Sequence, residues 1–96
     1  MTQYNGTATA VTEAGEAPVR INVREVPDGI RDPYWAGTMT IRAVEIWQAI
    51  ANHPEFGLRL PDGRVGTWQA AEGAGLPPTE TNPTTFPITR VDGVAF

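Results

Sequence analysis

The chain has 96 residues, of which 41% are apolar and 19% charged, and its formal net charge is −4. This length suits one domain with one core and is too short for two. All seven bases are arginines, spread along the chain among eleven acids. A nucleic-acid binder usually gathers its bases on one face, so this pattern argues against nucleic acid as a partner. There is no cysteine, which excludes disulfides, thiolate catalysis and cysteine-ligated metals.

The chain shows no targeting or membrane-spanning pattern. Residues 1–6 lack the basic and apolar regions of a signal peptide. No stretch approaches the roughly 20 apolar residues that cross a bilayer. We therefore expect a cytoplasmic protein that does not enter membranes, or one that forms part of a virion if it is encoded by a phage.

Two strands are expected in the first quarter of the chain. Residues 4–12 are rich in threonine and small residues, which predicts an edge strand. Residues 19–24 alternate strictly between apolar and polar, and they predict a strand that begins after Pro18. The buried face of this second strand would carry Val19, Ile21 and Val23.

A third strand is expected at 34–41, after a turn at 27–29 and a break at 32–33, both marked by proline. Its alternation places Trp35, Met39 and Ile41 on one face. Gly37 falls on that same face, where the missing side chain would leave room for a bulky neighbour.

Residues 43–52 change to helical spacing and predict one helix of about three turns. Thr40 is a candidate N-cap, and Pro54 ends the helix at His53. We expect this helix to close one opening or one face of the sheet with Trp47. The apolar stripe consists of Ala43, Trp47, Ile50 and Ala51, widened by Val44 and Ile46.

The second half predicts a hairpin, a loop and a last strand. Residues 58–68 are expected to form a hairpin around a Pro61-Asp62-Gly63 turn. Residues 73–83 are expected to form a surface loop, and residues 85–91 a strand. That strand places Phe86, Ile88 and Arg90 on one face. Residues 1–96 are therefore expected to form a single mainly β domain, a small barrel or two-layer sandwich of about six antiparallel strands with one short α-helix.

The polar residues suggest no catalytic, cofactor or metal site, and we expect a protein that is not an enzyme. His53 is the only histidine, and its place beside Pro54 favours a helix C-cap or the surface. The glycine pairs lack the Lys-Ser/Thr of a phosphate-binding loop. The paired carboxylates, a feature of glycoside hydrolases, fall here in solvated turns: Glu13 with Glu16, and Glu25 with Asp28.

Four aromatic side chains are the candidates for an interface or a pocket: Tyr34, Trp35, Trp47 and Trp68. Trp35 and Trp47 are expected to anchor the core, because a tryptophan buries on the order of 200 Å². The sequence does not assign Trp68 and Tyr34 to either the core or the surface. An exposed aromatic on a β surface would indicate a contact with a partner.

Three segments carry a resemblance to known proteins: Tyr4-x-Gly6-x-Ala8, the run Trp35-x-Gly37-Thr38-Met39-Thr40-Ile41, and Leu58-x-Leu60-Pro61-Asp62-Gly63-Arg64-x-Gly66. Their order resembles small uncharacterised actinobacterial and actinophage β-barrel-like proteins. It is also similar to the small β domain appended to some actinobacterial flavin monooxygenases. The resemblance covers most of the chain and implies a fold, with no activity or functional residue attached.

These observations favour a non-enzymatic interaction or assembly module, homo-oligomeric or a structural component of a phage. Edge strands such as 4–12 or 85–91 would pair with a protein partner or with a second copy. The alternative is a small-molecule-binding barrel whose pocket is lined by Trp35, Trp47 and Trp68. An enzyme that uses carboxylates and arginines is a third, weaker hypothesis.

Overall fold

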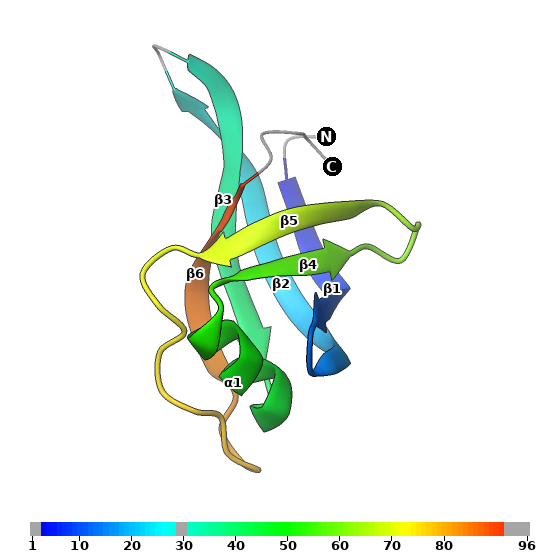
Figure 1. The fold of residues 1–96 in the computed structure, drawn as a ribbon. Coiled ribbons are helices and arrows are strands. Elements are labelled where there is room, and N and C mark those ends of the chain that lie inside the picture. The colour runs from blue at the N-terminus through cyan, green and yellow to red at the C-terminus, as the bar shows by residue number, and fades with distance from the viewer. Residues whose placement is uncertain (1–2, 29–30, 92–96) are drawn as a thin grey trace.

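The computed structural model describes residues 3–28 and 31–91, which form a closed barrel of six antiparallel strands with one short helix (Figure 1). The order around the barrel is β1-β2-β3-β6-β5-β4, and β4 returns to β1. The predicted mainly β fold is confirmed, and of the two predicted architectures it is the barrel. The elements are β1 (Gln3–Thr12), β2 (Gly15–Asp28), β3 (Arg31–Ile41), α1 (Val44–Asn52), β4 (Glu55–Arg59), β5 (Val65–Ala70) and β6 (Thr84–Arg90).

The strand predicted at 19–24 is longer than expected at both ends. Pro18 lies inside β2 and pairs with Thr9 of β1, whereas the sequence placed it before the strand. The pairing of β2 with β3 begins only at Arg20, opposite Thr40. A proline is tolerated at this position because no strand pairs with it on the β3 side.

β2 and β3 continue past their neighbours as a two-stranded arm, made of residues 25–28 and 31–35 (Figure 1). The predicted turn at 27–29 and break at 32–33 are therefore wrong for the described residues, because 27–28 belong to β2 and 32–33 to β3. Gly29 lies outside the described residues. Pro27 sits where the register shifts between Val26 and Asp28. Pro27 in β2 and Pro33 in β3 are both accommodated, because no described strand pairs with the outer edges of the arm.

The closed barrel shows that one of the two segments predicted as edge strands is not at an edge. β6 pairs with β3 on one side and with β5 on the other, so the segment 85–91 is not an open edge. β1 pairs with β2 along its whole length, but with β4 only at Thr9–Val11. Its remaining residues, Gln3–Ala8 and Thr12, have no described strand paired on the side away from β2. We call this side of Gln3–Ala8 the open edge.

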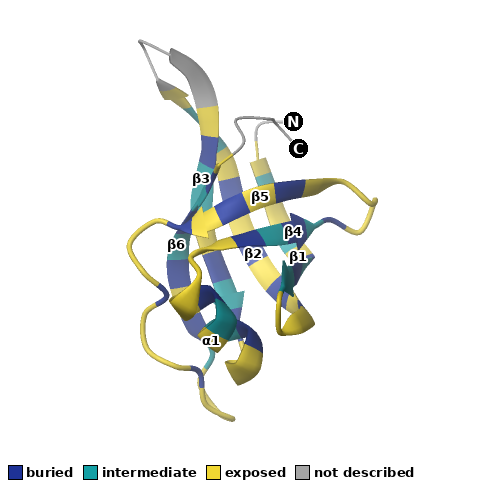
Figure 2. Cartoon of the chain, in the orientation of Figure 1, coloured by how far each residue is buried: buried dark blue, intermediate teal, exposed yellow. Residues whose placement is uncertain are grey.

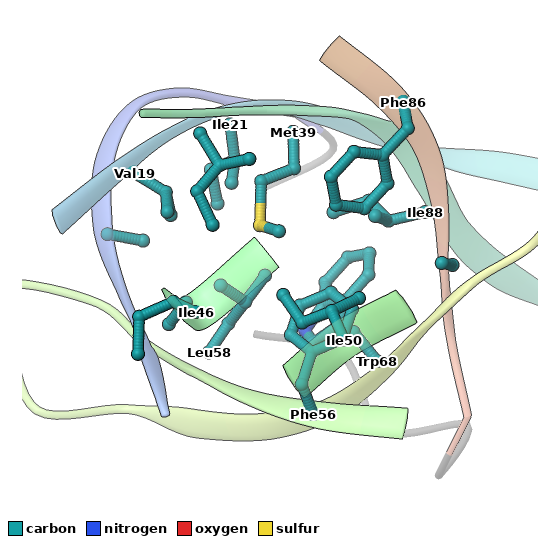
Figure 3. Packing of buried hydrophobic residues seen from close by; sticks show 14 of the residues in the cluster. Val19, Ile21, Met39, Ile46, Ile50, Phe56, Leu58, Trp68, Phe86 and Ile88 are labelled. Atoms are coloured by element: carbon teal, nitrogen blue, oxygen red, sulfur yellow. The ribbon is translucent and has the colours of Figure 1, made fainter. Parts of the chain in front are cut away.

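Helix α1 lies across one end of the barrel, as expected (Figure 1). Its buried side chains are Ile46 and Ile50, which reach the barrel interior (Figure 3). The buried face of the helix is therefore narrower than the predicted apolar stripe: Val44 and Ala51 are exposed, and Trp47 is half-buried.

The ends of α1 are set by backbone groups. Ala43 occupies the N-cap and makes no side-chain capping hydrogen bond. The predicted cap, Thr40, instead shares a 2.8 Å hydrogen bond with the hydroxyl of Thr85. At the other end the His53 backbone N–H donates to the Ala49 carbonyl at 2.9 Å, so the predicted C-cap is confirmed.

The core fills the barrel with side chains from all six strands and the helix (Figures 2 and 3). Inward residues alternate with exposed ones, most clearly in β5. The buried residues of β1 are the small Ala8 and Ala10, and the half-buried Tyr4 packs against the core, while the other strands supply larger buried residues. The largest fully buried side chains are Trp68, Ile21, Met39, Ile41, Ile50, Leu58, Ile88 and Val23.

Gly37 is half-buried and lies between Val23 and Ile88 in the strand register. The space beside it is taken by the backbone of β2. A Cβ at Gly37 would collide with the carbonyl oxygen of Asn22 and would lie 2.7 Å from the Cα of Val23. The prediction of a bulky side chain over Gly37 is therefore wrong, since two strands approach closely at this point.

The second half follows the expected order. The turn between β4 and β5 contains Pro61-Asp62-Gly63, and Gly63 has the positive φ of 94° that such turns require. Residues 71–83 form the connection to β6 and contain no strand or helix, apart from an isolated bridge between Ala71 and Gly73.

Candidate functional site

Two of the four candidate aromatics belong to the core. Trp35 is 2% exposed, as the sequence predicts, and Trp68 is 0% exposed. Trp68 lies beneath the guanidinium of Arg90, whose Cζ is 5.8 Å from the ring centroid. Arg90 is itself buried, on the inward face that the sequence assigned to it. Neither tryptophan is available to an external partner.

Trp47 is half-buried and holds the long connection against the helix. Its Nε1–H donates to the Ala74 carbonyl at 2.8 Å, and Ala74 is buried in the core. A second attachment lies at the end of the connection, where the Thr84 hydroxyl donates to the Leu76 carbonyl. The segment predicted as a surface loop is thus anchored at two carbonyl groups.

Trp47→Phe is expected to loosen this connection while the barrel stays folded. The substitution removes one hydrogen bond, at a cost of about 1 kcal/mol in the free energy of unfolding. Limited proteolysis within 74–83 should become several-fold faster. Leu76→Ala, at an exposed position of the same connection, is the control and should leave the rate unchanged. Equal proteolysis rates for Trp47→Phe and the wild type would contradict the anchoring role.

Tyr34 is the one candidate aromatic with a substantial exposed surface, at 40%. It pairs with Val26 in the arm. Each strand of the arm contains a proline, Pro27 in β2 and Pro33 in β3. Proline lacks the N–H that an added strand needs, and it commonly protects sheet edges against pairing. The arm is therefore poorly suited to strand addition, despite its length.

Three hollows on the surface are lined by residues other than the tryptophans. One of about 400 Å³ lies between the β1–β2 turn and the end of α1, and includes Glu13, His53 and Glu55. One of about 420 Å³ lies between the same turn and the start of α1. The third, of about 240 Å³, lies on the β1–β2–β3 face. None is the tryptophan-lined pocket of the alternative hypothesis.

Of the predicted acidic and histidine candidates, Glu13 and His53 line the same hollow, and the others lie apart from them. His53 is exposed, and Glu16 pairs with Arg59, with 2.6 Å between carboxylate and guanidinium. Glu25 is half-buried in the arm, and the side chain of Asp28 lies outside the described residues. Among residues 3–28 and 31–91, no three His, Asp or Glu side chains are grouped so as to hold a metal ion.

Among the carboxylates whose side chains the structure describes, Asp62 has a clear shift of its pKa. The backbone N–H of Arg64 donates to it at 3.0 Å and, with the nearby guanidinium, lowers the pKa of Asp62 below 3.8. A lowered pKa in the folded state stabilises the fold above the ordinary carboxyl pKa, and this contribution is lost as the pH falls through the lowered value. Because the side chain of Asp62 is exposed, solvent screens this contribution, which acts within the β4–β5 turn.

The open edge combines features that favour pairing with another strand. In antiparallel strands, half of the backbone N–H and C=O groups point to each side. In Gln3–Ala8 the half that points away from β2 faces no described strand. This segment has no proline and no charged residue, which are the common protective devices of edges. The Tyr4 hydroxyl donates to the Thr7 carbonyl at 2.6 Å and keeps the side chain close to the strand.

The outer face of β2 carries two exposed arginines, Arg20 and Arg24. Thr7, Arg20 and Thr40 stand in one cross-strand row, and Gln3 and Arg24 begin another. Arg42 follows the end of β3 and lines the same hollow as Arg20. The sequence did not predict that Arg20 and Arg42 lie together, because their proximity depends on the β2–β3 register. Asn5 and Thr7 were not predicted as site residues either, and the alternation of polar residues in 3–7 was the signal available for them.

Comparison with known proteins adds no relative. No protein-family model, curated protein or solved structure matches the chain. The resemblance to actinobacterial and actinophage proteins and to domains of flavin monooxygenases therefore stays a prediction. No helix among the described residues has the length and apolar character needed to span a bilayer.

Proposed function

We propose that this protein is a non-enzymatic assembly module that self-associates through the open edge of β1. The observation that carries the proposal is that no described strand pairs with β1 along Asn5–Ala8 on the side away from β2, in an otherwise closed barrel. Exposed backbone N–H and C=O groups are a template for another strand. Pairing would extend the β1–β2–β3 sheet from one barrel into a second.

A second copy of the chain is the partner that this edge fits best. Two identical edges related by a two-fold axis pair antiparallel and complement each other by symmetry. With the axis at Asn5, Gln3 would face Thr7 of the second copy, and Tyr4 would face Gly6. The large ring of Tyr4 would then lie opposite a residue without a side chain. No pair in this register brings like charges together, which would be destabilising.

Asn5→Lys tests the proposal because it places two ammonium groups opposite each other at the axis. We expect the dissociation constant of the dimer to rise about tenfold or more, from like-charge repulsion and the lost contact between the two asparagines. The measurement is light scattering after size exclusion, over a hundredfold range of concentration.

Asn22→Lys is the matched control. Asn22 is the β2 residue opposite Asn5, is likewise exposed, and lies one strand further from the open edge. It should leave the dissociation constant unchanged within about twofold. A wild-type protein that is monomeric throughout the range would contradict the proposal, and so would equal weakening by the two lysines.

A further inference from the structure

We propose that the hollow on the β1–β2–β3 face is a binding site for an oxyanion, namely a phosphate or phosphoryl group. The hollow has a volume of about 240 Å³ and is lined by Thr7, Pro18, Val19, Arg20, Thr40 and Arg42. This inference goes beyond self-association and does not depend on it.

Two arginines are among the residues that line the hollow, and no aspartate or glutamate is. Arg20 and Arg42 are exposed, and neither makes an ion pair with a described residue. By contrast, Arg59 is neutralised by Glu16, and Arg64 by Asp62. Arg20 and Arg42 therefore present positive charge in a protein whose net charge is negative.

Hydroxyl groups complete a donor set suited to an oxyanion. Thr7 and Thr40 stand on either side of Arg20 in the cross-strand row. The Thr40 hydroxyl is oriented by its 2.8 Å hydrogen bond with Thr85. A hydroxyl can accept one hydrogen bond and donate another, so it can accept from Thr85 while it donates to a ligand. The planar fork of a guanidinium matches a phosphate group with two parallel hydrogen bonds.

The size of the hollow favours a small anion or the terminal group of a larger ligand. Pockets that enclose drug-sized molecules are commonly about 300–1,000 Å³, and this hollow is smaller and lies on the face of a sheet. Thr7, Arg20 and Thr40 are neighbours in the strand register, so the backbone hydrogen bonds between β1, β2 and β3 fix their relative positions. The site thus has a rigid base with flexible arginine side chains above it.

The test is a titration with inorganic phosphate, followed by NMR of the backbone amides and the arginine Nε–H groups. A parallel titration uses glycerol phosphate, and sodium chloride at equal ionic strength is the control. We expect saturable shifts at Thr7, Arg20 and Thr40 with phosphate and none with chloride. Tighter binding of glycerol phosphate would identify a phosphoryl group on a larger ligand, and tighter binding of inorganic phosphate the free anion.

Arg20→Gln and Arg42→Gln should each weaken phosphate binding about tenfold, because each removes charge-assisted hydrogen bonds. Both positions are exposed, so the variants should keep the wild-type spectrum elsewhere. Arg64→Gln, in the β4–β5 turn, is the matched control and should bind phosphate as the wild type does. The absence of saturable shifts would overturn the proposal, as would equal weakening by Arg64→Gln.

Discussion

Gly37→Ala is expected to destabilise the barrel by about 3 kcal/mol, at the upper end of the range for overpacked cores. The added Cβ would overlap the Asn22 carbonyl oxygen and approach the Cα of Val23 to 2.7 Å. Both obstacles are backbone atoms, so no change of side-chain rotamer relieves them. Separating β2 from β3 would disturb the ladder that carries Val23 and Met39 into the core. For a domain of this size the melting temperature should fall by roughly 12–24 °C.

Gly57→Ala is the matched control, because it also adds one methyl group to a glycine in a strand. There the nearest atom is the Cβ of Val11 at 3.4 Å, which is close to an ordinary contact. The expected change in the free energy of unfolding is less than about 1 kcal/mol, measured by urea unfolding. If the two variants lost similar amounts of stability, the need for glycine at position 37 would not come from the close approach of β2 and β3.

Gly66→Ala is expected to cost about 2 kcal/mol by displacing Arg90. A Cβ at Gly66 would overlap the guanidinium of Arg90 and lie 2.7 Å from its Nε. That guanidinium covers the ring of Trp68, so its displacement also weakens a cation–π contact. The cost is lower than at Gly37 because the obstructing group is the end of a flexible side chain.

A double-mutant cycle separates this mechanism from a general intolerance of alanine at Gly66. In an Arg90→Ala background the obstruction is absent, so Gly66→Ala should cost less than about 0.5 kcal/mol. The resulting coupling energy, about 1.5 kcal/mol, is measurable by urea unfolding of the four proteins. An equal cost of Gly66→Ala in both backgrounds would contradict the packing of Arg90 against this glycine.

Local patterns predicted the elements whose signals are contained in a few neighbouring residues. The alternation of Val19, Ile21 and Val23 identified β2, and the change to helical spacing identified α1 within one residue of its start. Prolines were misleading because their effect depends on the neighbouring strands. Pro18 and Pro33 marked boundaries in the sequence, yet both lie within strands, at positions where no described strand pairs with their outer side.

Features that join distant parts of the chain were beyond local reasoning. The β1–β4 contact that closes the barrel involves only Thr9–Val11 on β1. The requirement for glycine at Gly66 arises from Arg90, which the β5–β6 pairing brings beside it. The grouping of Arg20 with Arg42 likewise needs the β2–β3 register. In each case the signal lies in the pairing of strands, which composition and periodicity do not encode.

Hydrogen exchange at two protein concentrations tests self-association through the open edge most directly. Samples at low and high concentration are compared by NMR or mass spectrometry, with attention to the amides of Gln3–Ala8. Pairing with a second copy would slow exchange in this segment at high concentration, and leave the outer face of β6 unchanged. Exchange in Gln3–Ala8 that is equally fast at both concentrations, in a protein of monomeric mass, would contradict the account.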